Sequence, residues 1–256
     1  KEVARAFTGW EVRKEKFVFN RWQHDTGSKT FLGHTGEYDG DDAVRIVLEQ
    51  PAAARFIARK LTRYFVCDEP ALPDALIEPL AQQLRENGFT IEPVIGRILS
   101  SNLFYSDHAI GQKVRSPVEL GVGLLRALEG ATDMYQLAAA LDRLGQAVFY
   151  PPNVKGWDGG RAWITASTLL GRANLVQRLT VREQARFGDA GLAALATKHG
   201  VESDEETVDW LLKLLVAVDV PPRVRHELIA LASGGGDKRM AKVVHAISTL
   251  PEFQLA

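Results

Sequence analysis

The chain has 256 residues, of which 31 are basic and 32 are acidic, so its formal net charge is −1. This balance excludes the strongly basic surfaces with which proteins hold nucleic acid or anionic membranes. The single cysteine, Cys67, excludes a disulfide framework and a cysteine-based metal site. A hydrophobic fraction of 46% is that of a globular protein with a sizeable core. No apolar run reaches the roughly 20 residues of a membrane-spanning helix, and the chain shows no signal peptide.

The first part of the chain predicts a short helix and a small β-hairpin. Val3, Ala4 and Phe7 have helical spacing, and Gly9 is placed to end that helix. Phe17 and Phe19 then alternate with polar residues, and a second short β-type run follows at residues 30–32, after the turn sequence HDTGSK. We expect the two runs to pair with each other as one hairpin, inserted at residues 15–35.

From residue 41 onward the sequence predicts helices almost throughout. Ser116 and Ser203 each stand three residues before a glutamate, in the pattern of a capping box. Other helices are expected to begin where a capping residue or a first-turn proline stands, at Asp41 or Asp42, Pro51, Thr90, Thr165 and Pro221. We therefore expect a mainly α fold, an irregular bundle of about ten helices that forms a single domain over residues 1–256.

The longest connection between helices is expected after Gly145, in a stretch that differs from the other connectors. Residues 149–165, FYPPNVKGWDGGRAWIT, contain paired prolines, three glycines and two tryptophans. Helix connections are usually short and polar, and large aromatic rings need a surface to cover or a partner to stack on. This loop is therefore expected either to plug the helical core or to bind a ligand.

A ligand site in this loop would use Asn153, Lys155, Trp157, Arg161 and Trp163. Aromatic faces beside amide and cationic groups suit a sugar ring or a peptide, because stacking and hydrogen bonds are then available together. The structural alternative is an ordered loop whose tryptophans lie under neighbouring helices, since most tryptophans are largely buried.

A second, weaker candidate is a metal site near the N-terminus, composed of His24, Asp25, His34 and Asp39. Histidine beside carboxylates can ligate a divalent cation or act as a base. The spacing matches neither a zinc-protease helix nor a calcium loop. The structural alternative is that Asp25 makes a turn with Gly27 and that Asp39 lies at the cap of the next helix.

Several phrases, taken in order, resemble the bacterial domain-of-unknown-function 1800 family. They are ARAFTGW, FVFNRWQHDTGSKTFLG, ARFIARKLTRYFV, KVRSPVEL, PPNVKGW and LPEFQLA, which extend over nearly the whole chain. The resemblance implies the C-terminal part of a longer bacterial protein, periplasmic or extracellular. It also implies a possible partner protein of the alkaline-phosphatase or sulfatase-like type. The family supplies no established reaction and hence no catalytic residues.

Three functions follow as expectations. The leading one is a helical interaction or scaffold module of an exported bacterial protein that acts with a partner protein, without catalytic residues or a cofactor. The first alternative is a module that binds a glycan or another cell-envelope polymer through the tryptophan-rich loop 149–165. The second is a metal-assisted hydrolase centred on His24 and Asp25. Nucleic acid is not expected as a partner, and no segment is expected to span a membrane.

Overall fold

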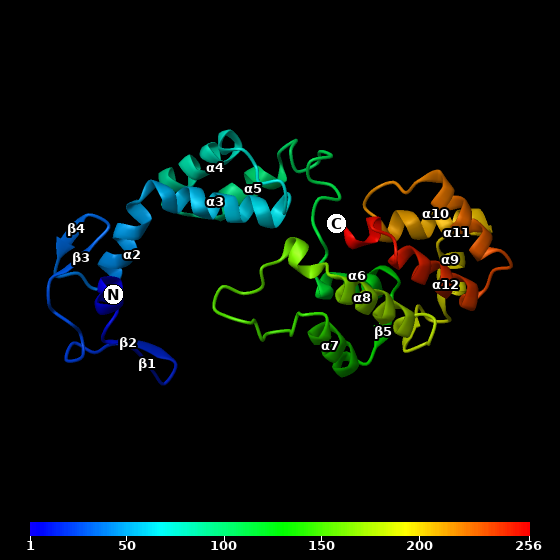
Figure 1. Ribbon diagram of the computed structural model, residues 1–256, viewed down its shortest axis with the longest axis horizontal. Coiled ribbons are helices and arrows are strands. Elements are labelled where there is room, and N and C mark those ends of the chain that lie inside the picture. The colour runs from blue at the N-terminus through cyan, green and yellow to red at the C-terminus, as the bar shows by residue number, and fades with distance from the viewer. The chain divides into compact units, whose positions relative to one another are not determined.

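A computed structural model describes residues 1–256 and confirms a mainly α protein, with twelve α-helices and a few short antiparallel strand pairs (Figure 1). Residues 1–62 and 72–97 form one compact unit, and residues 63–71 and 98–256 form a second. Each unit is described by itself below. The single domain over residues 1–256 stays a prediction.

The first unit combines two hairpins with helices. Its elements are α1 (Glu2–Ala6), β1 (Trp10–Arg13), β2 (Lys16–Phe19), β3 (Lys29–Phe31), β4 (His34–Gly36), α2 (Gly40–Glu49), most of α3 (Pro51–Phe65), α4 (Asp74–Glu86) and most of α5 (Glu92–Leu99). The ring of Trp10 lies directly on Gly40, the first residue of α2, where any larger residue would collide with the indole. Trp10 also makes edge contacts with Phe7 and Phe17, so β1 and β2 are fixed to α1 and α2 through aromatic rings.

The predicted pairing of the strands was wrong. The run at Phe17 does not pair with the run at Thr30: β1 pairs with β2, and β3 pairs with β4. Each pair closes through a two-residue turn with positive φ, at Lys14–Glu15 and at Leu32–Gly33. Such tight turns match the twist of the strands they join. The sequence Lys-Glu contains none of the Asn, Asp or Gly residues typical of this turn. The pairing of β1 with β2 was therefore not predicted. A fifth and a sixth strand, in the second unit, were also missed.

The second unit holds the larger core. Its elements are α6 (Pro117–Ala127), β5 (Gly130–Thr132), α7 (Met134–Arg143), η1 (Gly160–Trp163), α8 (Ala166–Leu179), β6 (Ala185–Phe187), α9 (Leu192–Lys198), α10 (Asp204–Leu215), α11 (Pro222–Ala232), α12 (Asp237–Ser248) and η2 (Glu252–Gln254). The predicted capping boxes form at Ser116 and Ser203, and a third forms at Thr165. Each satisfies orphan backbone N–H groups and sets where its helix begins.

The core of this unit is built around α6 and α12. The first packs against α7, α8 and α10, and the second against α8, α9, α10 and α11. Leu124, Val244, Ile247 and Phe253 are among the fully buried side chains. Each such side chain stabilises the fold by about 1.5–3 kcal/mol relative to exposure. Strands β5 and β6 pair at the edge of this core.

The C-terminal residues are joined to the segment that precedes α6. Lys113 and Ala256 exchange two backbone hydrogen bonds, and the Arg115 N–H donates to the Gln254 carbonyl over 2.8 Å. The Arg115 guanidinium lies 5.0 Å from the centre of the Phe253 ring. These contacts hold the end of the chain, LPEFQLA, against the start of KVRSPVEL.

Arg172 of α8 completes this junction from the core side. Its side chain is fully buried, and its guanidinium donates to the Arg115 carbonyl over 2.6 Å and to Gln254 Oε1 over 3.2 Å. No carboxylate pairs with it, and burial lowers the pKa of Arg172 to about 10. The group therefore stays charged at neutral pH, stabilised by amide oxygens rather than by an ion pair.

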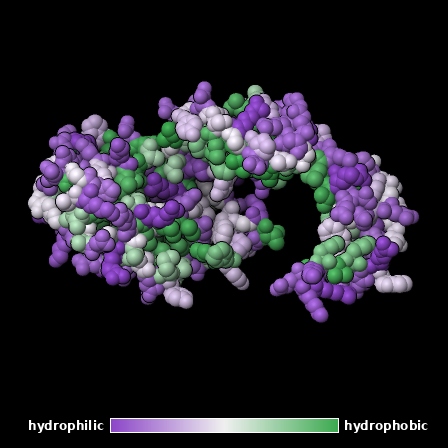
Figure 2. Space-filling model, turned by 180° about the vertical axis from the view of Figure 1, so that it is seen from behind, coloured by the Kyte–Doolittle hydropathy of each residue, from purple (hydrophilic) through white to green (hydrophobic).

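Hydrophilic residues cover much of the visible surface, with apolar residues exposed in small groups between them (Figure 2). None of the helices combines the length and the apolar character required to cross a lipid bilayer.

Replacing Arg172 by alanine should lower the free energy of unfolding by about 2–4 kcal/mol, because it leaves a cavity and two buried oxygen acceptors without donors. Urea unfolding followed by circular dichroism measures the change. Arg126 of α6, which is exposed, serves as the control, and Arg126→Ala should change the stability by less than about 0.5 kcal/mol. Equal effects of the two substitutions would contradict a structural role for Arg172.

Candidate functional site

The loop between α7 and α8 is anchored at both ends. Gln146 Oε1 accepts a hydrogen bond from the Val118 N–H over 2.9 Å, and the Trp163 carbonyl accepts one from Thr168 Oγ1 over 2.9 Å. The side chain of Trp163 is buried, with 8% exposure, and its ring lies close to Gly145 at the start of the loop. Trp163 thus closes the base of the loop and has the plugging role that the sequence offered as the structural alternative.

Two of the polar candidates, Asn153 and Lys155, bond within the loop, and Arg161 bonds outside it. Asn153 Oδ1 accepts from the Lys155 N–H over 2.9 Å, and Lys155 Nζ lies 2.6 Å from Asp158. Arg161 Nε lies 2.8 Å from Glu69, an acid outside the loop. These ion pairs are exposed, and each contributes only about 0–1 kcal/mol. They position the loop backbone, and Asn153, Lys155 and Arg161 do not share a common partner.

Of the two tryptophans, Trp157 is partly exposed and Trp163 is buried. The most exposed rings of the loop belong instead to Phe149 and Tyr150, at 96% and 81%, and Val154, four residues after Tyr150, is fully exposed. We call Phe149, Tyr150 and Val154 the loop tip. No local pattern in the sequence predicted that these three residues would be exposed.

The backbone of the loop tip is held by local structure. Tyr150 N–H donates to the Ala147 carbonyl over 3.0 Å, and Gly156 N–H donates to the Asn153 carbonyl over 3.0 Å. Phe149 has a φ of 63°, a left-handed conformation that is rare for a large side chain and costs on the order of 1–2 kcal/mol. The exposed aromatic pair is therefore displayed on two hydrogen-bonded turns.

The two strongest metal candidates have structural partners. His24 Nδ1 lies 2.9 Å from the Thr8 carbonyl. The Asp25 carboxylate accepts two hydrogen bonds from Arg5, over 2.7 and 2.9 Å, and one from the Gly27 N–H. The Arg5 guanidinium and then the Gly27 N–H lower the pKa of Asp25 to about 2. Asp25 thus closes a turn and pairs with a cation of the protein itself.

The other two metal candidates lie elsewhere. His34 pairs with Phe31 in the β3–β4 hairpin, and Asp39 caps α2 by accepting from the Asp42 N–H over 3.0 Å. Nowhere in residues 1–256 do three or more His, Cys, Asp or Glu side chains gather in a way that would hold a metal ion. The geometry accordingly gives the hydrolase alternative at His24 and Asp25 no support.

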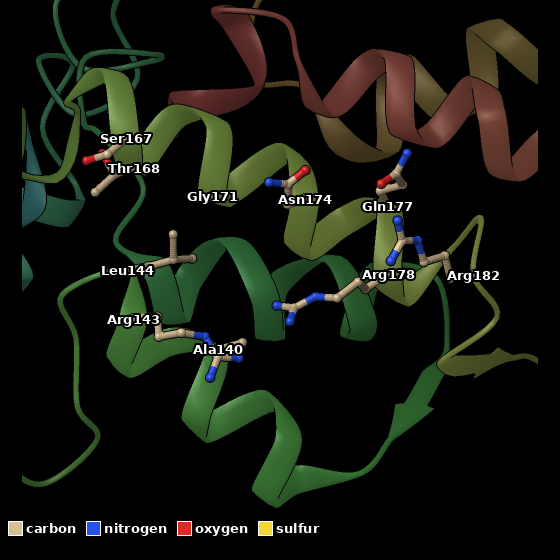
Figure 3. A pocket seen from close by; sticks show the side chains of 10 residues that line it. All are labelled: Ala140, Arg143, Leu144, Ser167, Thr168, Gly171, Asn174, Gln177, Arg178 and Arg182. Atoms are coloured by element: carbon tan, nitrogen blue, oxygen red, sulfur yellow. The ribbon is translucent and has the colours of Figure 1, made fainter.

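A basic pocket that the sequence analysis did not anticipate lies between α7 and α8, the two helices that the loop joins (Figure 3). Its volume is about 430 Å³, within the range of about 300–1,000 Å³ usual for small-molecule sites. The lining residues are Ala140, Arg143, Leu144, Ser167, Thr168, Gly171, Asn174, Gln177, Arg178 and Arg182. Three are arginines and none is acidic, so the pocket carries a local positive charge although the chain as a whole is nearly neutral.

The comparison with known proteins decides the family. The profile described as protein of unknown function (DUF1800) matches residues 1–255. The chain belongs to the DUF1800 family. No curated protein and no solved structure matches it.

Several phrases that carry the DUF1800 resemblance have structural roles. KVRSPVEL and LPEFQLA meet at the C-terminal junction, where Lys113 pairs with Ala256. The phrase that contains HDTGSK forms a loop around Lys29, whose buried Nζ donates to the carbonyls of Asp25 and Gly27 over 2.6 and 3.1 Å. These motifs are explained by folding. The loop tip and the basic pocket have no such explanation.

The pairing of Asp25 with Arg5 predicts a pH-dependent stability. The folded-state pKa of about 2 is below the ordinary value of 3.8. This carboxylate therefore stabilises the fold above a pH of about 4, and that contribution is lost as the pH falls toward about 2. The difference in Tm between the wild type and Asp25→Asn should shrink over this range. The exposed Glu15, which makes no ion pair, supplies the control Glu15→Gln. A difference that stays constant from about pH 5 to pH 2 would argue against the pairing.

Proposed function

We propose that this DUF1800 chain is a helical interaction module that binds a partner protein through the loop tip, Phe149, Tyr150 and Val154. The observation that carries the proposal is the exposure of two adjacent aromatic rings, 96% and 81%, on a loop whose base and backbone are anchored. A scattered exposed apolar residue needs no explanation. A group of exposed apolar residues on an anchored loop, in contrast, does call for an explanation.

The energetics favour a partner for these rings. Burial of a fully exposed phenylalanine contributes about 1.5–3 kcal/mol, and aromatic side chains dominate the binding energy of many protein interfaces. Because the tip is already held by its two turns, little further ordering would be needed on binding. The left-handed backbone of Phe149 is also energetically unfavourable, and no contact of the Phe149 ring within the fold offsets it.

The DUF1800 resemblance supports the setting of this interaction. It points to an exported bacterial protein, periplasmic or extracellular, and to a partner of the alkaline-phosphatase or sulfatase-like type. The loop tip is consistent with a protein partner because its side chains are aromatic and aliphatic rather than charged.

A glycan or cell-envelope polymer remains the second candidate for this loop, and one observation favours it. Trp157 is partly exposed, and in the sequence it stands between Lys155 and Asp158, which form an exposed ion pair. A sugar could stack on this indole while its hydroxyls bond to the charged pair. Trp157→Ala should then abolish glycan binding and leave protein binding unchanged.

The double variant Phe149→Ser/Tyr150→Ser tests the protein-binding proposal. Affinity-tagged wild type and variant are used to recover proteins from an envelope extract of the source bacterium, followed by quantitative mass spectrometry. An alkaline-phosphatase or sulfatase-like protein should be recovered with the wild type and reduced at least about tenfold with the variant. The Tm should change by no more than about 2 °C, because the substituted rings are exposed.

Met134 and Tyr135, which are also exposed in the second unit but lie on α7, provide the matched control. Met134→Ser/Tyr135→Ser should recover the partner as the wild type does. Equal recovery by the tip variant, or an equal loss with both double variants, would refute the assignment of the loop tip.

A further inference from the structure

Two arginines of the basic pocket converge from two helices. Arg143 extends from α7, and Arg178 extends toward it from α8, whereas Arg182 follows α8 and lies beside Gln177, farther from Arg143 (Figure 3). Arg143 is 35 residues before Arg178 in sequence, and the two line one cavity because the fold places α7 opposite α8 there. Like charges gathered in this way repel one another unless an anion lies between them.

These arginines differ from most others in the chain because none has an acidic partner. Arg55 and Arg59 pair with Glu78 and Asp74, and Arg225 pairs with Glu205 and Asp209. Arg143, Arg178 and Arg182 form neither an ion pair nor a side-chain hydrogen bond within the protein. Their guanidinium donors are free for an outside acceptor.

Arg178 provides a more specific indication. Its Nε is buried and has no acceptor within the protein, as is also true of the Nε of Arg172 in the core. An unsatisfied buried donor of this kind is destabilising, and native proteins retain few of them. An oxyanion in the pocket accepts from the terminal nitrogens of this guanidinium, the charge-assisted contact that arginine offers to phosphate and sulfate.

The rest of the pocket suits a body larger than a bare ion. Along α8 it reaches from Ser167 to Arg178, which is about 16 Å at a rise of about 1.5 Å per residue. The side-chain amides of Asn174 and Gln177 line this length and make no hydrogen bond within the protein. Amides both donate and accept, so they match the hydroxyl groups of a polyhydroxylated compound.

We propose that the pocket between α7 and α8 binds a phosphate or sulfate ester of a polyhydroxylated molecule. Arg143 and Arg178 hold the oxyanion, Arg182 adds positive charge beside Gln177, and Asn174 and Gln177 bond to the hydroxylated body. This site is separate from the loop tip, and it requires no covalent chemistry. Its ligand is recognised by charge and hydrogen bonds rather than by apolar stacking.

Isothermal titration calorimetry on the whole chain tests the site with named probes: glucose 6-phosphate, glucose 6-sulfate, inorganic phosphate, inorganic sulfate and glucose. At a constant ionic strength of about 0.15 M, at least one ester should bind with a Kd of about 1 mM or lower. That ester should bind more tightly than its inorganic ion, and glucose should not bind. The two ester arms show which oxyanion the site prefers.

The variant Arg143→Gln/Arg178→Gln should weaken ester binding at least about tenfold, because it removes the charge-assisted donors. Its Tm without ligand should not fall, since the substitution removes like charges that have no partner. Arg126→Gln, which changes an exposed arginine of α6 outside the pocket, should bind as the wild type does.

If the double variant does not fold, Arg182→Gln replaces it, because Arg182 is exposed and its substitution should not disturb the fold. The Arg182→Gln substitution should weaken ester binding by about threefold or more. The proposal is overturned if neither ester binds, if an inorganic ion binds as tightly as its ester, or if the pocket variants bind as tightly as Arg126→Gln. The loop-tip variant should retain full ester binding, so failure here and failure of the proposed partner interaction are distinguishable.

Discussion

The second unit depends on one buried cation, the guanidinium of Arg172. It joins α8 to the Arg115 carbonyl before α6 and to the Gln254 side chain near the end of the chain, so three segments far apart in sequence meet at one side chain. A buried charge without a carboxylate is tolerated only where oxygen atoms are placed to accept from it. The position of α8 is therefore tied to the correct placement of both other segments.

Because the position of α8 is fixed in this way, the positions of the loop before it and of the pocket beside it are fixed as well. The loop tip lies in the connection that enters α8, and the basic pocket lies along the side of α8 that faces α7. Arg172 and Arg178 are six residues apart and lie on different faces of one helix, one turned into the core and the other into the pocket. A single rigid helix thus connects the interior of the fold with both surfaces proposed to bind.

Much of the helical architecture followed from local chemistry, because a cap or a first-turn proline acts within a few residues. Ser116 and Ser203 marked their helices correctly for this reason. Pairing of strands is a competition between partners, and Lys14–Glu15 gave no sign of the tight turn that decides it. Whether Trp163 or Phe149 lies exposed, and whether Arg143 meets Arg178, depends on how helices pack, which no local pattern encodes. The sequence therefore marked the loop as rich in aromatic rings but did not show which of them lie exposed, and it contained no sign of the pocket.

The exposed loop tip also bears on how the chain withstands digestion. Proteases attack protruding loops first, and those that cut after aromatic residues would meet Phe149 and Tyr150 there. Tyr150 is followed by two prolines, whose rings fix the backbone and remove the N–H groups that an enzyme cleft would engage. Cleavage after Tyr150 is thereby obstructed, and the bond between Phe149 and Tyr150 is the one left open. The proline pair thus leaves two exposed aromatic residues in solvent while protecting the peptide bond that follows Tyr150.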